Sequence, residues 1–175
     1  MKSLYLFTFV FVFTVVNVSA QTAEIKWYTI EEAQKLNAKN PRNILIDVYT
    51  DWCGWCKVMD KETFANPVIA KYINANFYPV KFDAESTAPV NFAGKTFVNQ
   101  GGGSRPTHQL ATAFGVTGYP TIVYLTEKLE VISPVSGFYK PEKIEPLLHF
   151  IVEKKYKDNV KLEDYEKTFV SELKK

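Results

Sequence analysis

The sequence contains few of the residues that bind metals or form covalent cross-links. Its 175 residues include two cysteines, two histidines and two methionines. A structural zinc site needs about four cysteine or histidine ligands, but there is no second cysteine pair, and His108 and His149 lie far apart in the sequence. Covalent haem attachment would need a histidine directly after Cys56, where the chain has Lys57. We therefore expect no metal and no cofactor, and we expect both histidines to be helix residues rather than catalysts.

The sequence also lacks an excess of charge of either sign. There are 21 basic and 19 acidic side chains, which gives a formal net charge of +2. A balance so close to neutral offers no electrostatic footprint for nucleic acid or for an anionic membrane. The lysine-rich stretch from 153 to 164 is interleaved with acidic residues, which is typical of a solvated helical face. No nucleic-acid partner is expected.

Long hydrophobic runs are rare, and the clearest one lies at the N-terminus, at Leu4–Val16. It follows Lys2, and small residues that a signal peptidase reads end at Ala20. The run is shorter than the roughly 20 residues of a membrane-spanning helix, which favours a cleaved signal peptide at 1–20 over an uncleaved anchor. The remainder, 21–175, has the length of a single domain. We expect a periplasmic or secreted protein.

The two cysteines form a C-x-x-C pair within the motif WCGWC, directly after the apolar run 44–49. Residues three apart on a helix share one face, and a disulfide needs Cα atoms only about 4.4–6.8 Å apart, so the pair can close and reopen with little movement. A bridge around two residues restricts the unfolded chain very little, which argues against a structural role. Cys53 would lie at the helix start, where the macrodipole favours a thiolate, and Cys56 would be less exposed and react second.

Hydrophobic periodicity predicts alternating helices and strands. Thr29–Glu32 has the form of a capping box, and Asn66–Pro67 that of an N-cap followed by proline at the first helical position. The expected helices cover 30–40, the region from the cysteines to 64, 68–76, 107–114, 141–152 and 162–173. The expected strands cover 44–50, 77–83, 121–126 and 129–135. This order predicts an α/β fold with a central sheet between two layers of helices. The insert 84–106, with a short strand near 95–98, and a C-terminal helical extension at 157–175 lie outside the simple pattern.

Five separated features resemble the thioredoxin superfamily, and in particular its exported thioredoxin-like group. They are the WCGWCK motif, Asp47 six residues before the first cysteine, Lys81 on the next strand, the loop Gly115–Thr121 with its proline, and Gly137 after the last strand pair. The resemblance implies a single thioredoxin-like domain with a mixed three-layer fold. It also implies a cis peptide bond before Pro120 in a loop that faces the cysteines.

The residues alone leave two interpretations of Asp47 open. A carboxylate within a buried strand is costly unless it is paired, and burial raises its pKa. Asp47 could be a general base for the Cys56 thiol, tuned by Lys81, or the two residues could form a structural ion pair. The resemblance favours the catalytic role, so the expected catalytic residues are Cys53, Cys56, Asp47 and Lys81.

The residues expected to contact substrate surround the cysteines. Trp52 and Trp55 flank a reactive sulfur, and aromatic residues are enriched in protein contacts, although both could instead belong to the core. The resemblance implies that the backbone of Tyr119, next to Pro120, pairs with an extended substrate strand beside Cys53. The glycine run at the end of the insert has no Walker-type lysine after it, so we expect a flexible loop on the surface near the active site.

The sequence thus predicts a protein-disulfide reductase that works outside the cytoplasm as a monomer. The dipeptide between the cysteines has no histidine, so no nearby cation supports the thiolate of a strong oxidant, and reduction is favoured over oxidation. Such an enzyme needs an electron donor, and a membrane electron transporter is the expected partner. The alternatives are a disulfide oxidase or isomerase, a reductase for cytochrome c maturation, and a thioredoxin-like binding module that does not cycle.

Overall fold

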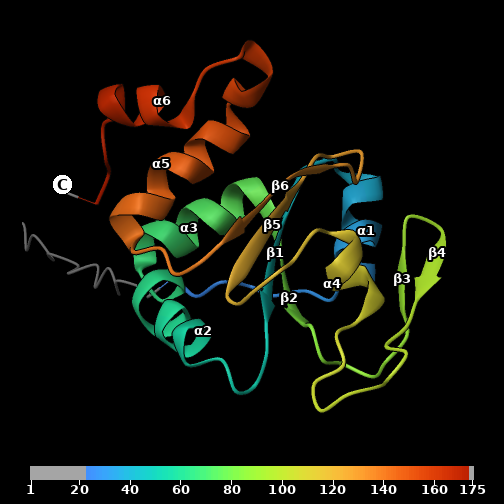
Figure 1. Ribbon diagram of the computed structural model, residues 1–175. Coiled ribbons are helices and arrows are strands. Elements are labelled where there is room, and N and C mark those ends of the chain that lie inside the picture. Colours follow the sequence, from blue (N-terminus) through green and yellow to red (C-terminus); the bar gives the residue numbers. More distant parts are fainter. Residues whose placement is uncertain (1–22, 174–175) are drawn as a thin grey trace, which may run out of the picture.

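A four-stranded mixed sheet forms the centre of the computed structural model, which describes residues 23–173 (Figure 1). The strands are β1 (Asn43–Tyr49), β2 (Phe77–Asp83), β5 (Thr121–Leu125) and β6 (Val131–Ser136), in the order β2-β1-β5-β6. Strand β1 is parallel to β2 and antiparallel to β5, which is antiparallel to β6. The expected signal peptide lies outside the described residues, and no helix within them is long and apolar enough to cross a membrane.

Helices cover both faces of this sheet, as expected. They are α1 (Ile30–Lys39), α2 (Gly54–Met59), α3 (Pro67–Asn76), α4 (Gln109–Ala113), α5 (Pro141–Val152) and α6 (Leu162–Thr168), with a π-helical turn at Asp60–Phe64 and a 3₁₀ turn at Lys155–Asp158. One hydrophobic cluster joins α1 and α4 to one face of the sheet, and a second joins α2, α3 and α5 to the other face. The molecule is therefore a three-layer α/β structure, and α6 lies against α5 outside these layers (Figure 1).

Strand β1 passes through the middle of the molecule, and its side chains alternate between the two cores. Ile44, Ile46 and Val48 point into the cluster with α1, while Leu45 points into the cluster with α2. Because successive side chains of a strand face opposite ways, Asp47 lies on the same face as Leu45. The sheet therefore directs its one buried carboxylate toward the helix that carries the cysteines.

Local signals in the sequence set the starts of two helices. The Thr29 hydroxyl accepts a hydrogen bond from the Glu32 N–H, and the Glu32 side chain accepts one from the Thr29 N–H, which is the expected capping box. The Asn66 side chain accepts from the first two free N–H groups of α3, and Pro67 occupies its first position. Both predictions are confirmed.

Helix α6 is shorter than the sequence predicts, because it ends at Thr168 rather than at Leu173. Beyond it the chain bends back toward α5, where the buried Glu145 carboxylate accepts hydrogen bonds from the Ser171 hydroxyl at 2.5 Å and from the Glu172 N–H at 2.7 Å. Leaving a buried carboxylate without partners is costly. Satisfying Glu145 therefore outweighs another helical turn.

Helix α4 and strand β6 also begin later than expected. The His108 ring, fully buried, accepts a hydrogen bond from the Leu110 N–H and so caps α4, which starts at Gln109 rather than Thr107. Leu129 adopts a left-handed conformation with φ of 66° in the turn before β6, so the strand starts after it. In both places a contact or turn that periodicity does not reveal moves the boundary.

The insert 84–106 contains a hairpin that contributes to the core. Strands β3 (Val90–Phe92) and β4 (Lys95–Phe97) pair antiparallel, and the latter confirms the expected short strand. The Asn91 N–H donates to the Glu31 carboxylate of α1, and Val90 and Phe92 are buried. Only part of the insert is therefore a surface loop.

Candidate active site

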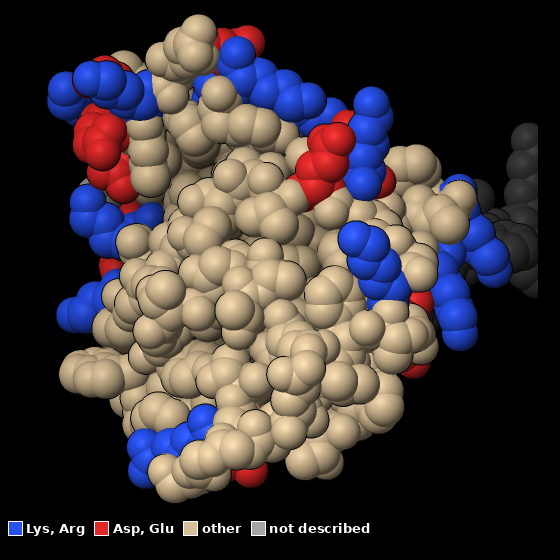
Figure 2. All heavy atoms as spheres, turned by 45° about the vertical axis from the view of Figure 1, so that its right-hand side comes forward, with Lys and Arg blue, Asp and Glu red and all other residues tan. Residues whose placement is uncertain are grey.

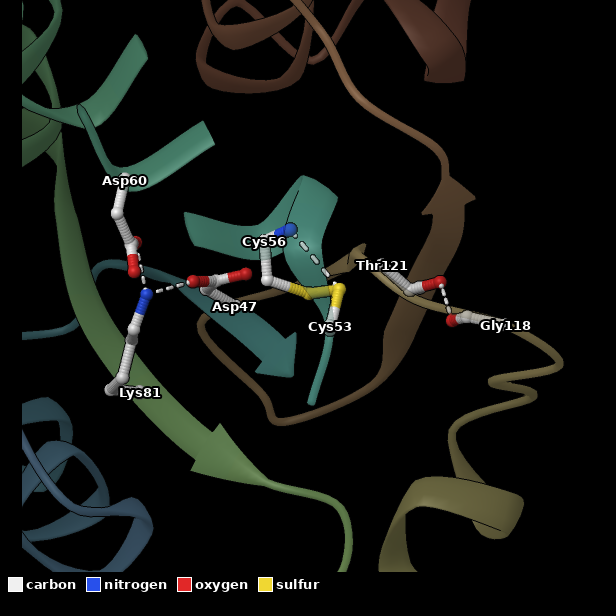
Figure 3. Close-up of a disulfide and its surroundings, with 7 residues drawn as sticks. All are labelled: Asp47, Cys53, Cys56, Asp60, Lys81, Gly118 and Thr121. Carbon is white, nitrogen blue, oxygen red and sulfur yellow. Dashed lines mark hydrogen bonds and ion pairs between the residues drawn. A yellow bond between two sulfur atoms is a disulfide. The ribbon is translucent and has the colours of Figure 1, made fainter. Parts of the chain in front are cut away.

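The cysteines form a disulfide at the start of α2 (Figure 3). Their Cα atoms are 5.3 Å apart, and Cys53 caps the helix, with its sulfur accepting a hydrogen bond from the Cys56 N–H at 3.1 Å. Cys53 is 5% exposed and Cys56 3%, so the expected difference in exposure is small in this oxidised state. Little of either cysteine is therefore open to solvent in this state.

Asp47 of β1 lies beside this disulfide (Figure 3) and is 2% exposed. Burial raises its pKa to about 6, although the Lys81 ammonium, 2.5 Å from Oδ2, acts in the opposite direction. Among the described residues, no group donates a hydrogen bond to Oδ1. In Figure 3 the carboxylate points toward Lys81 on one side and toward the Cys56 side chain on the other. This geometry gives Asp47 a free acceptor on the side of the cysteines.

A second carboxylate, Asp60, shares the Lys81 ammonium with Asp47, and the sequence analysis did not identify it. Burial lowers the pKa of Lys81, but the two carboxylates raise it and the net shift is upward, so the cation stays charged. Asp60 is four residues after Cys56, a spacing that places both on one face of a helix and could have revealed it. Three aromatic rings lie within 6 Å of the ammonium, those of Trp27, Tyr49 and Phe64.

The loop before β5 brings Tyr119 and Pro120 to the cysteines. The Tyr119–Pro120 bond is cis, as expected. The Thr121 hydroxyl donates to the Gly118 carbonyl at 2.7 Å and so closes this turn (Figure 3). A pocket of about 270 Å³ lies here, lined by Trp55, Tyr119, Pro120, Gly137 and Phe138.

Trp52 and Trp55 are among the most exposed large hydrophobic side chains of the described residues, at 48% and 62%. The ring of Trp55 packs against Phe138, with centroids 5.4 Å apart. The Trp52 indole N–H donates to Glu85 at 2.9 Å, and the Arg105 guanidinium lies 4.2 Å from its ring centroid. The two ends of the insert therefore hold Trp52 beside Cys53, a contact that the sequence did not reveal because the partners are distant in the chain.

Beside these tryptophans lies a surface with very little charge. From Ser86 to Thr126 the only charged side chains are Lys95 and Arg105. Figure 2 brings the side of the molecule with β3, β4 and α4 to the front, and there the charged side chains gather at the rim while the centre is free of them. Within residues 23–173, no group of three or more His, Cys, Asp or Glu could hold a metal ion. The site thus combines a cysteine pair joined by a disulfide, a buried acid and a surface with little charge.

Comparison with known proteins identifies the family. Residues 30–151 match the family described as the thioredoxin-like domain. The uncharacterized protein B0495.5 of Caenorhabditis elegans is 31% identical over 129 residues, which cover 72% of this chain and 16% of that protein. The thiol:disulfide interchange protein DsbD of Haemophilus influenzae is 28% identical over 122 residues, or 66% of this chain and 18% of that protein. The chain thus spans less than a fifth of these relatives' length.

Among solved structures, a thioredoxin from Thermus thermophilus superimposes with a TM-score of 0.58 at 19% identity, covering 75% of this chain and 89% of that one. At that identity the likeness concerns the fold. The family match extends over well more than half of the chain, from α1 to the end of α5. The protein therefore belongs to the thioredoxin-like family.

Proposed function

We propose that the protein is a thiol–disulfide oxidoreductase that reduces protein disulfides outside the cytoplasm. The observation that carries the proposal is the Cys53–Cys56 disulfide at the start of α2, with a buried carboxylate, Asp47, whose free oxygen points toward it. The relative from Haemophilus influenzae bears the name thiol:disulfide interchange protein, which supports the same chemistry. A static bridge of this size would contribute little to stability.

The reaction begins with the dithiol form of the protein. The Cys53 thiolate attacks one sulfur of the substrate disulfide, the S–S bond breaks, and the other substrate sulfur leaves as a thiolate. Cys56 then loses its proton and attacks the Cys53 sulfur of the mixed disulfide, which expels the second substrate sulfur. The products are two substrate thiols and the Cys53–Cys56 disulfide, so two electrons have passed to the substrate.

Asp47 acts in the second step as the acceptor of the Cys56 proton. A general base works best when its pKa lies near the working pH, and burial raises the pKa of Asp47 to about 6. Lys81 holds the carboxylate through Oδ2, which leaves Oδ1 for the proton. The two interpretations left open by the sequence are therefore compatible, because one residue can be both the partner of Lys81 and the base.

The substrate lies along the cis-proline loop and the two tryptophans. An extended segment pairs with the backbone of Tyr119, while its side chains contact Trp52 and Trp55. Trp52 is 48% exposed and Trp55 62%, and no charged residue lies between 106 and 126. This surface suits uncharged polypeptide segments better than charged ones.

The proposal also includes the direction of electron transfer and the location of the protein. No cation lies in the Gly54–Trp55 dipeptide to stabilise a Cys53 thiolate, which favours reduction. The proposed signal peptide 1–20 would direct the domain 21–175, a monomer, to the periplasm or outside the cell. A reductase there needs electrons, which a membrane electron transporter would supply through its own dithiol.

A measured reduction potential tests the direction. We expect a value near the thioredoxin end of the scale, about −270 mV, and insulin reduction that depends on Cys53. A potential near about −120 mV would instead indicate a disulfide oxidase. A pair that does not equilibrate with glutathione at all would leave only a binding role for the fold.

A further inference from the structure

A groove next to the cis-proline pocket is formed in part by the C-terminal extension. It has a volume of about 570 Å³ and lies between the start of α5 and the first turns of α6. Phe138, Tyr139 and Leu162 supply its apolar lining, and its other lining residues are charged, with both signs represented: Lys140, Glu142, Lys143, Glu163 and Glu166. Because the two signs are mixed, the groove suits an apolar side chain within a polypeptide better than an ion of either sign.

This groove adjoins the pocket of the cis-proline loop. Phe138 lines both the 270 Å³ pocket of the cis-proline loop and the 570 Å³ groove. The Gly137 N–H donates to the Pro120 carbonyl at 2.8 Å, and the Tyr139 carbonyl accepts from the Thr63 hydroxyl at 2.6 Å. The segment 137–139, which lies between the two cavities, is therefore held at both ends. No charged residue occurs in the chain from Val131 to Tyr139.

The far wall of the groove is fixed as well. Lys143 of α5 pairs with Glu166 of α6 at 3.4 Å. The Tyr165 hydroxyl donates to Glu153 at 2.8 Å, and its ring packs against Phe150 with centroids 5.6 Å apart. Because α6 is held to α5 by several contacts, the groove is present before any ligand arrives and needs no ordering of the extension.

We propose that the groove between α5 and α6 is a second binding site for the substrate, occupied by an apolar side chain of the polypeptide segment that continues from the reacting cysteine past Phe138. The inference rests on the proposed function, since a substrate cysteine that reaches Cys53 must bring its neighbouring residues over the cis-proline pocket. An extended chain advances about 3.3 Å per residue, so a few residues are enough to pass Phe138. The site favours extended segments that carry an apolar side chain over segments too short to reach the groove.

Single-turnover reduction of two kinds of synthetic peptide tests this site, and every peptide carries one cysteine as a mixed disulfide with glutathione. The short peptide has a single flanking residue on each side of the cysteine. The long peptides have glycine–serine spacers and one leucine, placed two to six residues from the cysteine on its N-terminal or its C-terminal side. The protein is first reduced with dithiothreitol, freed of excess reagent, and followed by tryptophan fluorescence. We expect one leucine position to raise kcat/KM about tenfold over the short peptide.

Matched variants test whether the rise in kcat/KM comes from the groove. Leu162→Ser removes an apolar wall of the groove, and Glu163→Trp fills part of it without removing packing; both should lower the ratio of long-peptide to short-peptide kcat/KM three- to tenfold. Val170→Ser is the control, because Val170 is on the same extension, 78% exposed and outside the groove. Thermal melting checks that each variant is folded.

The outcomes separate this proposal from the function itself. If neither peptide is reduced by the unmodified protein, the proposed function fails. If both are reduced but no leucine position helps, or if Leu162→Ser and Glu163→Trp keep the full ratio, the second site is wrong. A shift from dimer to monomer on Leu162→Ser, measured by sedimentation, would assign the groove to a second copy of the chain and would also overturn the proposal.

Discussion

Asp47 is a buried carboxyl group with a raised pKa, and its ionisation should affect stability as well as activity. Its pKa rises from 3.8 to about 6 on folding, mainly through burial. A carboxyl group with a raised pKa in the folded state favours folding below about pH 4, and this contribution is lost as the pH rises through about 6. The shift corresponds to about 3 kcal/mol.

Asp47→Asn should therefore change the pH dependence of stability in the oxidised protein. Relative to the unmodified protein, the variant should gain up to about 3 kcal/mol of unfolding free energy between pH 4 and pH 7.5. The Lys81 ammonium is not left alone by the change, because Asp60 still pairs with it. Urea unfolding at both pH values measures the effect, with the exposed Asp51→Asn as control. A difference that does not vary with pH would contradict the burial of an ionised carboxylate.

The same substitution should slow the second chemical step. If Asp47 accepts the Cys56 proton, Asp47→Asn should lower the rate of mixed-disulfide resolution on the order of a hundredfold at pH 7, with the first attack much less affected. Single-turnover kinetics with quenching separate the two steps. Normal resolution would assign Asp47 a purely structural role as the partner of Lys81.

The cysteines should show unequal roles in trapping experiments. Cys56→Ser should accumulate a mixed disulfide through Cys53, because no thiol remains to resolve it, while Cys53→Ser should form none and lose insulin reduction. Mass spectrometry after mixing each variant with an oxidised peptide reads the adduct directly. An adduct on Cys53→Ser alone would reverse the order of attack.

At the scale of elements, the insert 84–106 divides into a packed hairpin and an exposed loop. Phe92 of β3 is 8% exposed and its ring lies 5.1 Å from that of Phe114, so Phe92→Ala should cost about 3 kcal/mol of stability. Phe97→Ala on β4, a half-buried position, is the control and should cost less. Removing the whole insert should therefore unfold or weaken the domain, whereas shortening the loop 101–103 should not. Equilibrium unfolding of the four variants decides this.

The elements that the sequence predicted correctly are those specified by neighbouring residues. Thr29 and Asn66 cap their helices through hydrogen bonds that span only a few positions, and β2 coincides with its predicted range because Asn76 ends a helix where a dense apolar run begins. The end of α6 could not be predicted, since it depends on Glu145, which is more than 20 residues away in the chain.

The residues of the candidate site also divide into those with a local signal in the sequence and those that depend on distant segments. The cysteine motif, Asp47, Lys81 and Pro120 could be named from their spacing and from the resemblance, because each carries a local signature. Partners supplied by distant segments gave no such sign. They are Glu85 and Arg105 on Trp52, and Phe138 beside Trp55. Asp60, the second partner of Lys81, differs from these, because its spacing of four residues from Cys56 could have revealed it.

At the scale of the whole molecule, the proposed direction of electron flow fixes which redox state is more stable. A strong oxidant has a stabilised reduced form, so a reductase should show the opposite. Both sulfurs are at most 5% exposed in the disulfide, and the dipeptide offers no cation to hold a thiolate, while the buried Asp47 disfavours a second negative charge nearby. The reduced state therefore receives little special stabilisation from the fold.

We expect the oxidised protein to resist urea better than the protein kept reduced with dithiothreitol. The difference in unfolding free energy must equal the shift of the folded pair's reduction potential from that of the unfolded chain, at about 1.4 kcal/mol for every 30 mV. Measuring both stabilities and both potentials closes a thermodynamic cycle, and the Cys53→Ser, Cys56→Ser double variant shows which effects of dithiothreitol do not come from the cysteines. A more stable reduced form would identify an oxidant, and the direction of transfer proposed for this protein would have to be reversed.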